Sequence, residues 1–161
     1  MDISNISEER AILYVAQNFE DKELVLQILS KYPGKIIKAV ETLFEYVSPN
    51  FQKVEGLIVK MAREFPTYAY NIVETVIGKI PHREISQSYV YAIFANIINA
   101  DDAIKIAEIA IEKKLCYPQN LVAQRPALAI SVASLDCCTP ADISAIMRMN
   151  SSFFKDLKII N

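Results

Sequence analysis

Residues 39–44 read AVETLF and residues 72–77 read IVETVI, and this repetition is the strongest sign of how the chain folds. A shift of 33 positions lays the second stretch on the first, and the same shift lays Phe65-Pro66 on Tyr32-Pro33. Proline ends one helix and suits the first turn of the next. The sequence therefore predicts two consecutive helix pairs that are built alike.

Prolines 33, 49, 66 and 81 recur at nearly even intervals, and apolar residues between them return every three or four positions, which indicates amphipathic helices. We expect helices over 8–19, 22–31, 35–47, 51–64, 68–80, 84–98, 102–114, 127–135, 140–149 and 151–160. Their expected N-caps are Ser7, Asp21, Asn50, Thr67, Asp101 and Thr139. No stretch alternates at period two for long enough to require a strand.

The repeat continues more weakly toward the carboxyl end. With one further residue inserted, residues 107–111 (AEIAI) keep the same pattern of apolar and acidic residues and indicate a third unit. Arg125-Pro126 could begin a fourth unit. Over about residues 20–135 the chain resembles a HEAT-like helical-repeat protein, whereas the tetratricopeptide pattern fails because its tryptophan and leucine-glycine pair are missing. The resemblance implies an all-α fold of eight to ten helices, with antiparallel hairpins stacked as a short right-handed α-solenoid. An irregular multi-helix bundle is the alternative.

Composition indicates one soluble globular domain over residues 1–161. The chain is 52% hydrophobic and 22% charged, and its net charge of -2 implies no polyanionic or polycationic partner. The amino terminus lacks the features of a secretory signal, and no apolar stretch reaches the ~20 residues that cross a bilayer. We expect no membrane association.

The three cysteines are odd in number, and two of them are adjacent, which suits free thiols better than disulfides. Free thiols favour the cytosol, either of the producing cell or of a host. Gly34, Gly56 and Gly78 lie too far apart for a phosphate-binding loop, and we expect the latter two to mark close helix crossings. With a single histidine, the sequence predicts neither a cofactor nor a metal.

The sequence offers candidate residues for two functions, catalysis and nucleic-acid binding. An enzyme would need an unrecognised site around His82, which could meet Cys116, Cys137 or Cys138 in space. A nucleic-acid-binding repeat protein would need a basic face, for which Lys31, Lys35, Lys38, Lys60 and Arg63 are the candidates. Acidic residues lie among these bases, which favours an ordinary mixed surface.

Tyr70 suggests a third function, protein binding. Tyr68 aligns with the apolar stripe of its helix, whereas Tyr70 lies beside Glu74 on the polar side, and an exposed tyrosine is a common interface anchor. Tyr89 and Tyr91 are weaker candidates for such an anchor. The sequence predicts an adaptor whose unidentified protein partner binds Lys38, Glu41, Tyr70, Asn71, Glu74 and Glu108. A bacterial effector that binds a host protein is a variant of this hypothesis, and no oligomeric state is predicted.

Overall fold

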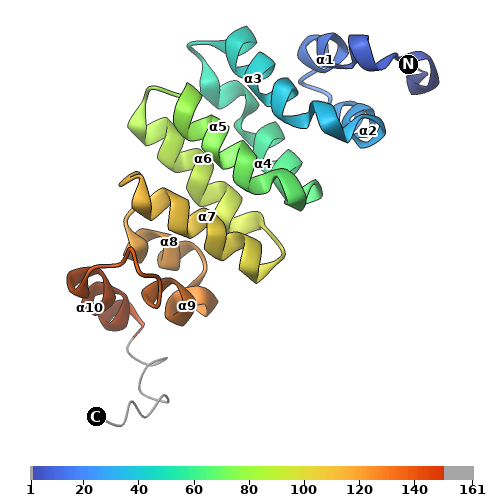
Figure 1. The fold of residues 1–161 in the computed structure, drawn as a ribbon. Coiled ribbons are helices and arrows are strands. Elements are labelled where there is room, and N and C mark those ends of the chain that lie inside the picture. Colours follow the sequence, from blue (N-terminus) through green and yellow to red (C-terminus); the bar gives the residue numbers. More distant parts are fainter. Residues whose placement is uncertain (1, 151–161) are drawn as a thin grey trace.

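The computed structural model describes residues 2–150, and every regular element in that range is helical. The α-helices, shown in Figure 1, are α1 (Glu8–Gln17), α2 (Lys22–Lys31), α3 (Ile36–Val47), α4 (Glu55–Glu64), α5 (Ala69–Lys79), α6 (Arg83–Asn96), α7 (Ala100–Glu112), α8 (Pro118–Gln124), α9 (Ala129–Ala133) and α10 (Pro140–Met149). The 3-10 turns are Ile3–Asn5, Pro33–Lys35, Phe51–Val54, Pro66–Tyr68 and Pro126–Leu128. The all-α class is confirmed, and none of the described helices has both the length and the apolar character to cross a membrane.

The helices form two layers. Helices α1, α3, α5, α7 and α9 contact one another in that order, and we call them the odd layer. Helices α2, α4, α6, α8 and α10 do the same in the even layer. Figure 1 shows the resulting stack, which runs from the blue amino-terminal end to the orange and red carboxyl end. Helices α3 and α5, which carry the two repeated stretches, are therefore neighbours in the same layer.

The repeated proline motif has the same backbone geometry at each occurrence. Tyr32 has φ -129 and ψ 65, and Phe65 has φ -120 and ψ 65, because the ring of the following proline disfavours the helical region. Each proline then begins a 3-10 turn that leads into α3 or α5. Arg125, with φ -143 and ψ 79, introduces α9 in the same way. The motif therefore starts three helices of the odd layer.

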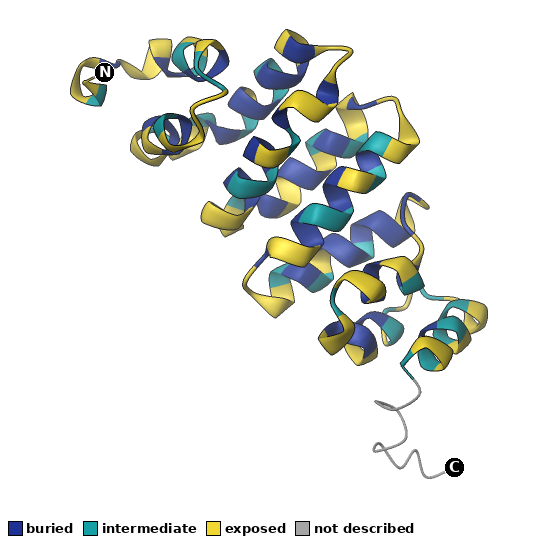
Figure 2. Cartoon of the chain, turned by 180° about the vertical axis from the view of Figure 1, so that it is seen from behind, coloured by how far each residue is buried: buried dark blue, intermediate teal, exposed yellow. Residues whose placement is uncertain are grey.

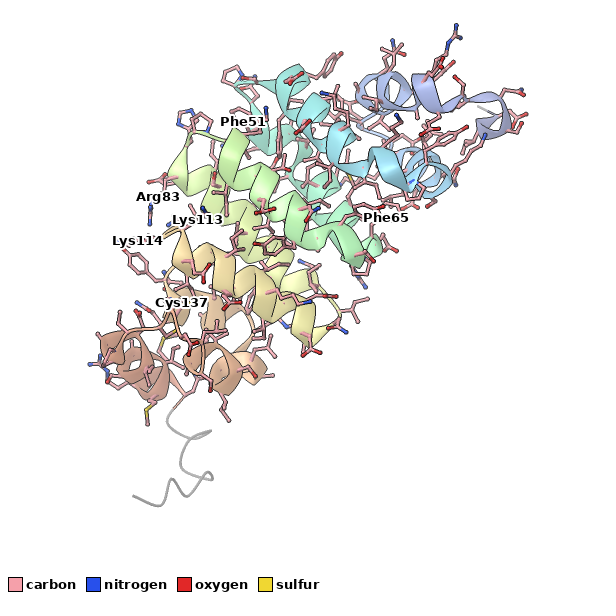
Figure 3. All side chains as sticks on the ribbon, in the orientation of Figure 1. Phe51, Phe65, Arg83, Lys113, Lys114 and Cys137 are labelled. Carbon is pink, nitrogen blue, oxygen red and sulfur yellow. The ribbon has the colours of Figure 1, made fainter. Side chains whose placement is uncertain are left out.

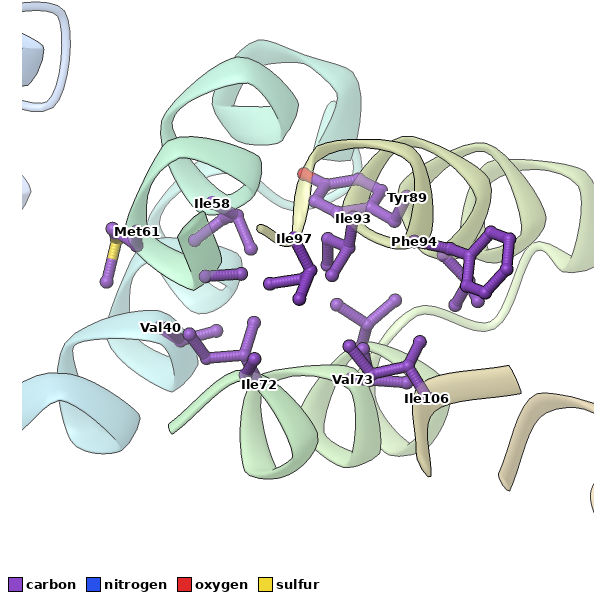
Figure 4. Packing of buried hydrophobic residues seen from close by; sticks show 14 of the residues in the cluster. Val40, Ile58, Met61, Ile72, Val73, Tyr89, Ile93, Phe94, Ile97 and Ile106 are labelled. Atoms are coloured by element: carbon purple, nitrogen blue, oxygen red, sulfur yellow. The ribbon is translucent and has the colours of Figure 1, made fainter. Parts of the chain in front are cut away.

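The core lies between the two layers. One hydrophobic cluster of buried residues extends from Ile6 to Ile146. In Figure 4, Val40, Ile72, Val73 and Ile106 of the odd layer face Ile58, Met61, Tyr89, Ile93 and Phe94 of the even layer. Figure 2 shows the buried residues along the inner sides of the helices and the exposed ones on the outer sides. Burying this apolar surface supplies most of the driving force for folding.

Several helix ends agree with the sequence. Helix α2 has the expected bounds, and its cap Asp21 accepts a hydrogen bond from the Leu24 N–H at 3.1 Å. At the start of α10, Thr139 and Asp142 form a reciprocal capping box. The predicted helix 51–64 begins instead as a 3-10 turn, where Asn50 precedes the turn without a side-chain hydrogen bond, and continues as α4.

Other helix ends differ from the prediction. Thr67 lies inside the 3-10 turn Pro66–Tyr68, so it does not cap α5. Helix α7 is capped by Asn99, whose Oδ1 accepts from the N–H groups of Asp101 and Asp102, so Asp101 is a first-turn acid and not the cap. Helix α8 was not predicted, and α9 is shorter than the predicted 127–135. The predicted helix 151–160 lies outside the described residues.

The expectation that Gly56 and Gly78 mark close helix crossings is wrong. A Cβ atom built at Gly78 would meet no other atom within 4 Å. At Gly56 it would meet only the flexible end of the Lys22 side chain, with Nζ 2.8 Å away. Neither glycine is therefore required for helix packing.

Candidate interaction face

The structure places all six predicted site residues on three successive helices of the odd layer. Lys38 and Glu41 lie on α3, Glu108 lies on α7, and the central helix α5 carries Tyr70, Asn71 and Glu74. None of the six is buried: Lys38, Tyr70, Asn71 and Glu74 are exposed, and Glu41 and Glu108 are half-buried. We call the surface that carries these six residues the α3–α5–α7 face.

An open surface groove of about 440 Å³ lies between α3 and α5 on this face. It is lined by Ile37, Glu41, Asn71, Glu74, Thr75, Gly78 and Lys79. Three of the predicted residues thus share one concave surface. At its edge, Lys38 forms an ion pair with Glu41 at 3.6 Å, a pairing of positions i and i+3 that is worth about 0.2–0.5 kcal/mol on an exposed helix.

Tyr70 of α5 lines a pocket that residues of α7 also line. The residue is 39% exposed and lines this second pocket, of about 310 Å³, together with Pro66, Thr67, Asp102 and Lys105. Desolvation by neighbouring atoms raises the pKa of Tyr70, and the nearby carboxylates of Glu74, Glu112 and Glu108 raise it further because they oppose a phenolate. At neutral pH, Tyr70 is therefore a neutral hydrogen-bond donor.

The residues predicted from the sequence leave out part of this face, although the internal repeat could have identified it. The alignment that relates Glu41, Glu74 and Glu108 also relates Lys38, Asn71 and Lys105, one turn earlier in each helix. Lys105 lies in the Tyr70 pocket. Glu112, one turn after Glu108, acts on the pKa of Tyr70. These two residues could have been added by extending the repeat alignment by one turn in either direction.

Tyrosine exposure follows the sequence argument only in part. Tyr68 is half-buried, in keeping with its place on the apolar stripe of its helix. Tyr89 is fully buried, so it is not an exposed anchor, and Tyr91 is half-buried. Tyr46 at 62% and Tyr117 at 55% are both more exposed than Tyr70. Tyr70 is therefore distinguished by its acidic neighbours and its pocket, since exposure alone does not separate it from other tyrosines.

The candidate basic residues do not form a free basic face. Lys31 donates to the backbone carbonyl oxygens of Ile3, Ser4 and Ile6 at 3.1–3.3 Å. Lys35 pairs with Glu8 at 3.7 Å, Lys38 pairs with Glu41, and Lys60 pairs with Glu23. Four of the five candidates therefore already face protein acceptors, which reduces their attraction for phosphate groups.

The candidate catalytic residues are not assembled into a site. Cys116 and Cys137 line a pocket of about 720 Å³ together with Arg83 and Lys114, along one side of the helix stack in Figure 3, and His82 does not line it. Burial raises the pKa of the Cys116 thiol to about 11, so it is protonated at neutral pH. Within residues 2–150, no group of three or more His, Cys, Asp or Glu side chains is placed to hold a metal ion.

Comparison of the chain with protein-family models, with curated proteins and with solved structures found no match.

Proposed function

We propose that the chain is a short HEAT-like α-solenoid that serves as an adaptor and binds another protein through the α3–α5–α7 face. The observation that carries this proposal is the recurrence of Glu41, Glu74 and Glu108 on neighbouring helices of one layer. In helical-repeat proteins, equivalent positions of successive units form a continuous recognition surface. Tyr70 supplies the aromatic anchor that such a surface commonly uses.

Two features support a protein partner. The face combines a shallow groove with an exposed aromatic ring and both signs of charge, as interfaces between proteins do. The candidate lysines for nucleic-acid binding face carboxylates and carbonyl oxygens of the protein. We place the adaptor in the cytosol, which the free thiols of Cys116, Cys137 and Cys138 support.

Affinity capture from a native cytosolic extract tests the proposal. The bait is the wild-type chain, a Tyr70→Ala, Glu74→Lys double variant, or a matched Tyr117→Ala, Glu84→Lys variant. The control changes the same residue types at exposed positions outside this face, since Tyr117 precedes α8 and Glu84 lies in the first turn of α6. We expect the first variant to recover its partner at least about tenfold less well than wild type, because interface anchors commonly cost more than 1.4 kcal/mol when truncated.

The control variant should recover the partner as well as wild type does. Equal recovery by wild type and by the Tyr70→Ala, Glu74→Lys variant would show that the α3–α5–α7 face is not the binding surface. Circular dichroism of each bait confirms that the variants keep the helical fold.

A further inference from the structure

The pocket of about 720 Å³ lies where helices α6, α8 and α10 begin and α7 ends. Its lining combines a thiol, two cations and an exposed aromatic ring, which belong to Cys137, Arg83, Lys114 and Tyr117. Figure 3 shows Arg83, Lys114 and Cys137 along one side of the stack. None of the six residues that define the α3–α5–α7 face lines this pocket. The pocket is thus separate from that face, and its volume suits a small organic molecule.

The three thiols in this region differ in how easily they can be reached. Cys116 also lines the pocket but is only 4% exposed. Cys138 is turned toward the protein, since its Sγ atom donates a hydrogen bond to the backbone carbonyl oxygen of Val132 at 3.2 Å. Cys137 lines the pocket and is only half-buried. Cys137 is therefore the thiol that a molecule in the pocket reaches most easily.

The pocket does not activate this thiol. Burial raises the pKa of Cys137, so the thiolate is a minor species at neutral pH. A preference of Cys137 for one reagent over another must therefore come from the groups around it, through binding of the reagent.

Two cations of the lining are available to an anionic ligand. In the described part of the chain, neither Arg83 nor Lys114 forms an ion pair. Arg83 donates to the backbone carbonyl oxygen of Lys114, which keeps the two cationic residues together. Of the two carboxylates in the lining, Asp142 accepts hydrogen bonds from Thr139 in the capping box of α10, whereas Glu112 is exposed. The pocket therefore offers two cations and one exposed carboxylate to a ligand.

These charges are complementary to those of glutathione, a tripeptide with two carboxylates, one ammonium group and one thiol. We propose that glutathione disulfide binds in this pocket and forms a mixed disulfide with Cys137. Arg83 and Lys114 pair with the carboxylates of the bound tripeptide, and Glu112 pairs with its ammonium group. Cys137 is thus a modification site whose reagent is selected by the charged residues of the pocket.

The reaction is a thiol–disulfide exchange. The Cys137 thiolate attacks one sulfur of glutathione disulfide, a new S–S bond forms to Cys137, and the S–S bond of the reagent breaks. The departing glutathione takes the electron pair of the broken bond and binds the proton that Cys137 released. Cys137 is oxidised and one half of the reagent is reduced, so no other oxidant is required.

The test uses the full reduced chain and three symmetrical disulfides, namely the anionic glutathione disulfide, the neutral bis(2-hydroxyethyl) disulfide and the cationic cystamine. Intact-mass spectrometry follows the rate of each addition at low salt, and peptide mapping locates the adduct. Each rate is divided by the rate at which the same disulfide reacts with free N-acetylcysteine amide, which removes differences in intrinsic reactivity. We expect the glutathione adduct on Cys137, with a normalised rate about fivefold or more above that of the neutral disulfide.

A charge reversal in the pocket makes the result specific. Lys114→Glu should slow the addition of glutathione by about threefold or more and accelerate the addition of cystamine by a similar factor. Lys22→Glu makes the same change at the start of α2, near the other end of the stack, and should leave both rates within about twofold of wild type. Cys138→Ser should keep the glutathione adduct and Cys137→Ser should lose it. Circular dichroism confirms that each variant keeps the helical fold.

The inference is overturned if glutathione adds to Cys116 or Cys138 and not to Cys137, or if no adduct forms. It is equally overturned if the normalised rates do not depend on the charge of the disulfide, or if Lys22→Glu changes them as much as Lys114→Glu does. None of these measurements involves the partner of the adaptor, so their outcome is independent of the capture experiment.

Discussion

The phenolic hydroxyl of Tyr89 donates a hydrogen bond to the backbone carbonyl oxygen of Phe51, and both residues are buried. This bond joins α6 to the 3-10 turn that precedes α4. The Tyr89 ring also packs edge-on against Phe44 of α3, with ring centroids 5.7 Å apart. One side chain thus connects α6 to α3 and to the turn that follows α3, both of which lie far earlier in the sequence.

Removal of this hydroxyl should destabilise the protein. We expect Tyr89→Phe to lower the free energy of unfolding by about 1–3 kcal/mol, because the buried carbonyl oxygen of Phe51 loses its partner. Urea denaturation followed by circular dichroism measures the change. Tyr46→Phe is the matched control, since the Tyr46 side chain is largely exposed and its variant should stay within about 0.5 kcal/mol of wild type. Equal stabilities for the two variants would contradict the structural role of Tyr89.

Arg125 should stabilise the end of α6. Its Nη1 atom donates to the carbonyl oxygens of Phe94 at 3.2 Å and Ile97 at 2.5 Å. Carbonyl oxygens at the end of a helix have no N–H donor within the helix. We expect Arg125→Met, which keeps much of the apolar stem, to cost about 2 kcal/mol in chemical denaturation. Arg148→Met at an exposed position of α10 is the control and should change stability by less than about 0.5 kcal/mol. A loss no larger than that of the control would show that these two bonds contribute little.

Gly78→Ala should stabilise the protein. A methyl group at this position meets no other atom, and alanine is favoured over glycine in a helix by up to about 1 kcal/mol. Thermal unfolding should therefore occur at a higher temperature in this variant. Gly56→Ala should gain less, because the Lys22 ammonium group must move away from the new methyl. A destabilised Gly78→Ala variant would mean that helix α5 packs more tightly at this position than the structure indicates.

Stability should fall as the pH rises from about 9 to 11. Burial raises the pKa of the Cys116 thiol to about 11 in the folded chain, so the unfolded chain loses this proton first. The unfolded state then binds fewer protons than the folded state, and the free energy of unfolding decreases with pH. A shift of two pKa units corresponds to about 2–3 kcal/mol in total.

Cys116→Ala should make this decline shallower. The comparison uses the slope of stability against pH in urea denaturation between pH 8 and 10.5, so the constant cost of the cavity left by the thiol cancels. Burial also raises the pKa of Cys138, which should preserve part of the slope in the variant. Identical slopes in wild type and variant would contradict the pKa assigned to Cys116.

Much of the fold could be predicted from local patterns. Proline spacing and apolar periodicity place most helices, since both signals act within one turn of the chain. Helix α8 was missed because Pro118–Gln124 is only seven residues long and shows little periodicity. The start of α5 was misplaced because the sequence does not distinguish a 3-10 turn from the first turn of an α-helix.

The residues of the candidate site could be predicted from the sequence, but their arrangement in space could not. The repeat relates Glu41, Glu74 and Glu108 because the equivalent helices have similar sequences. The effect of Glu112 on the pKa of Tyr70 depends on how α5 and α7 pack together, which no local pattern contains. For the same reason, the sequence could not show that the suspected glycine contacts are absent.

A crosslinking measurement tests the proposed binding face most directly. A photoreactive phenylalanine analogue replaces Tyr70 in one sample and the more exposed Tyr46 in another, and both are irradiated in native cytosolic extract. We predict a discrete crosslinked protein with the analogue at position 70 and none with the analogue at position 46. A crosslinked protein obtained from position 46 but not from position 70 would contradict binding through the α3–α5–α7 face.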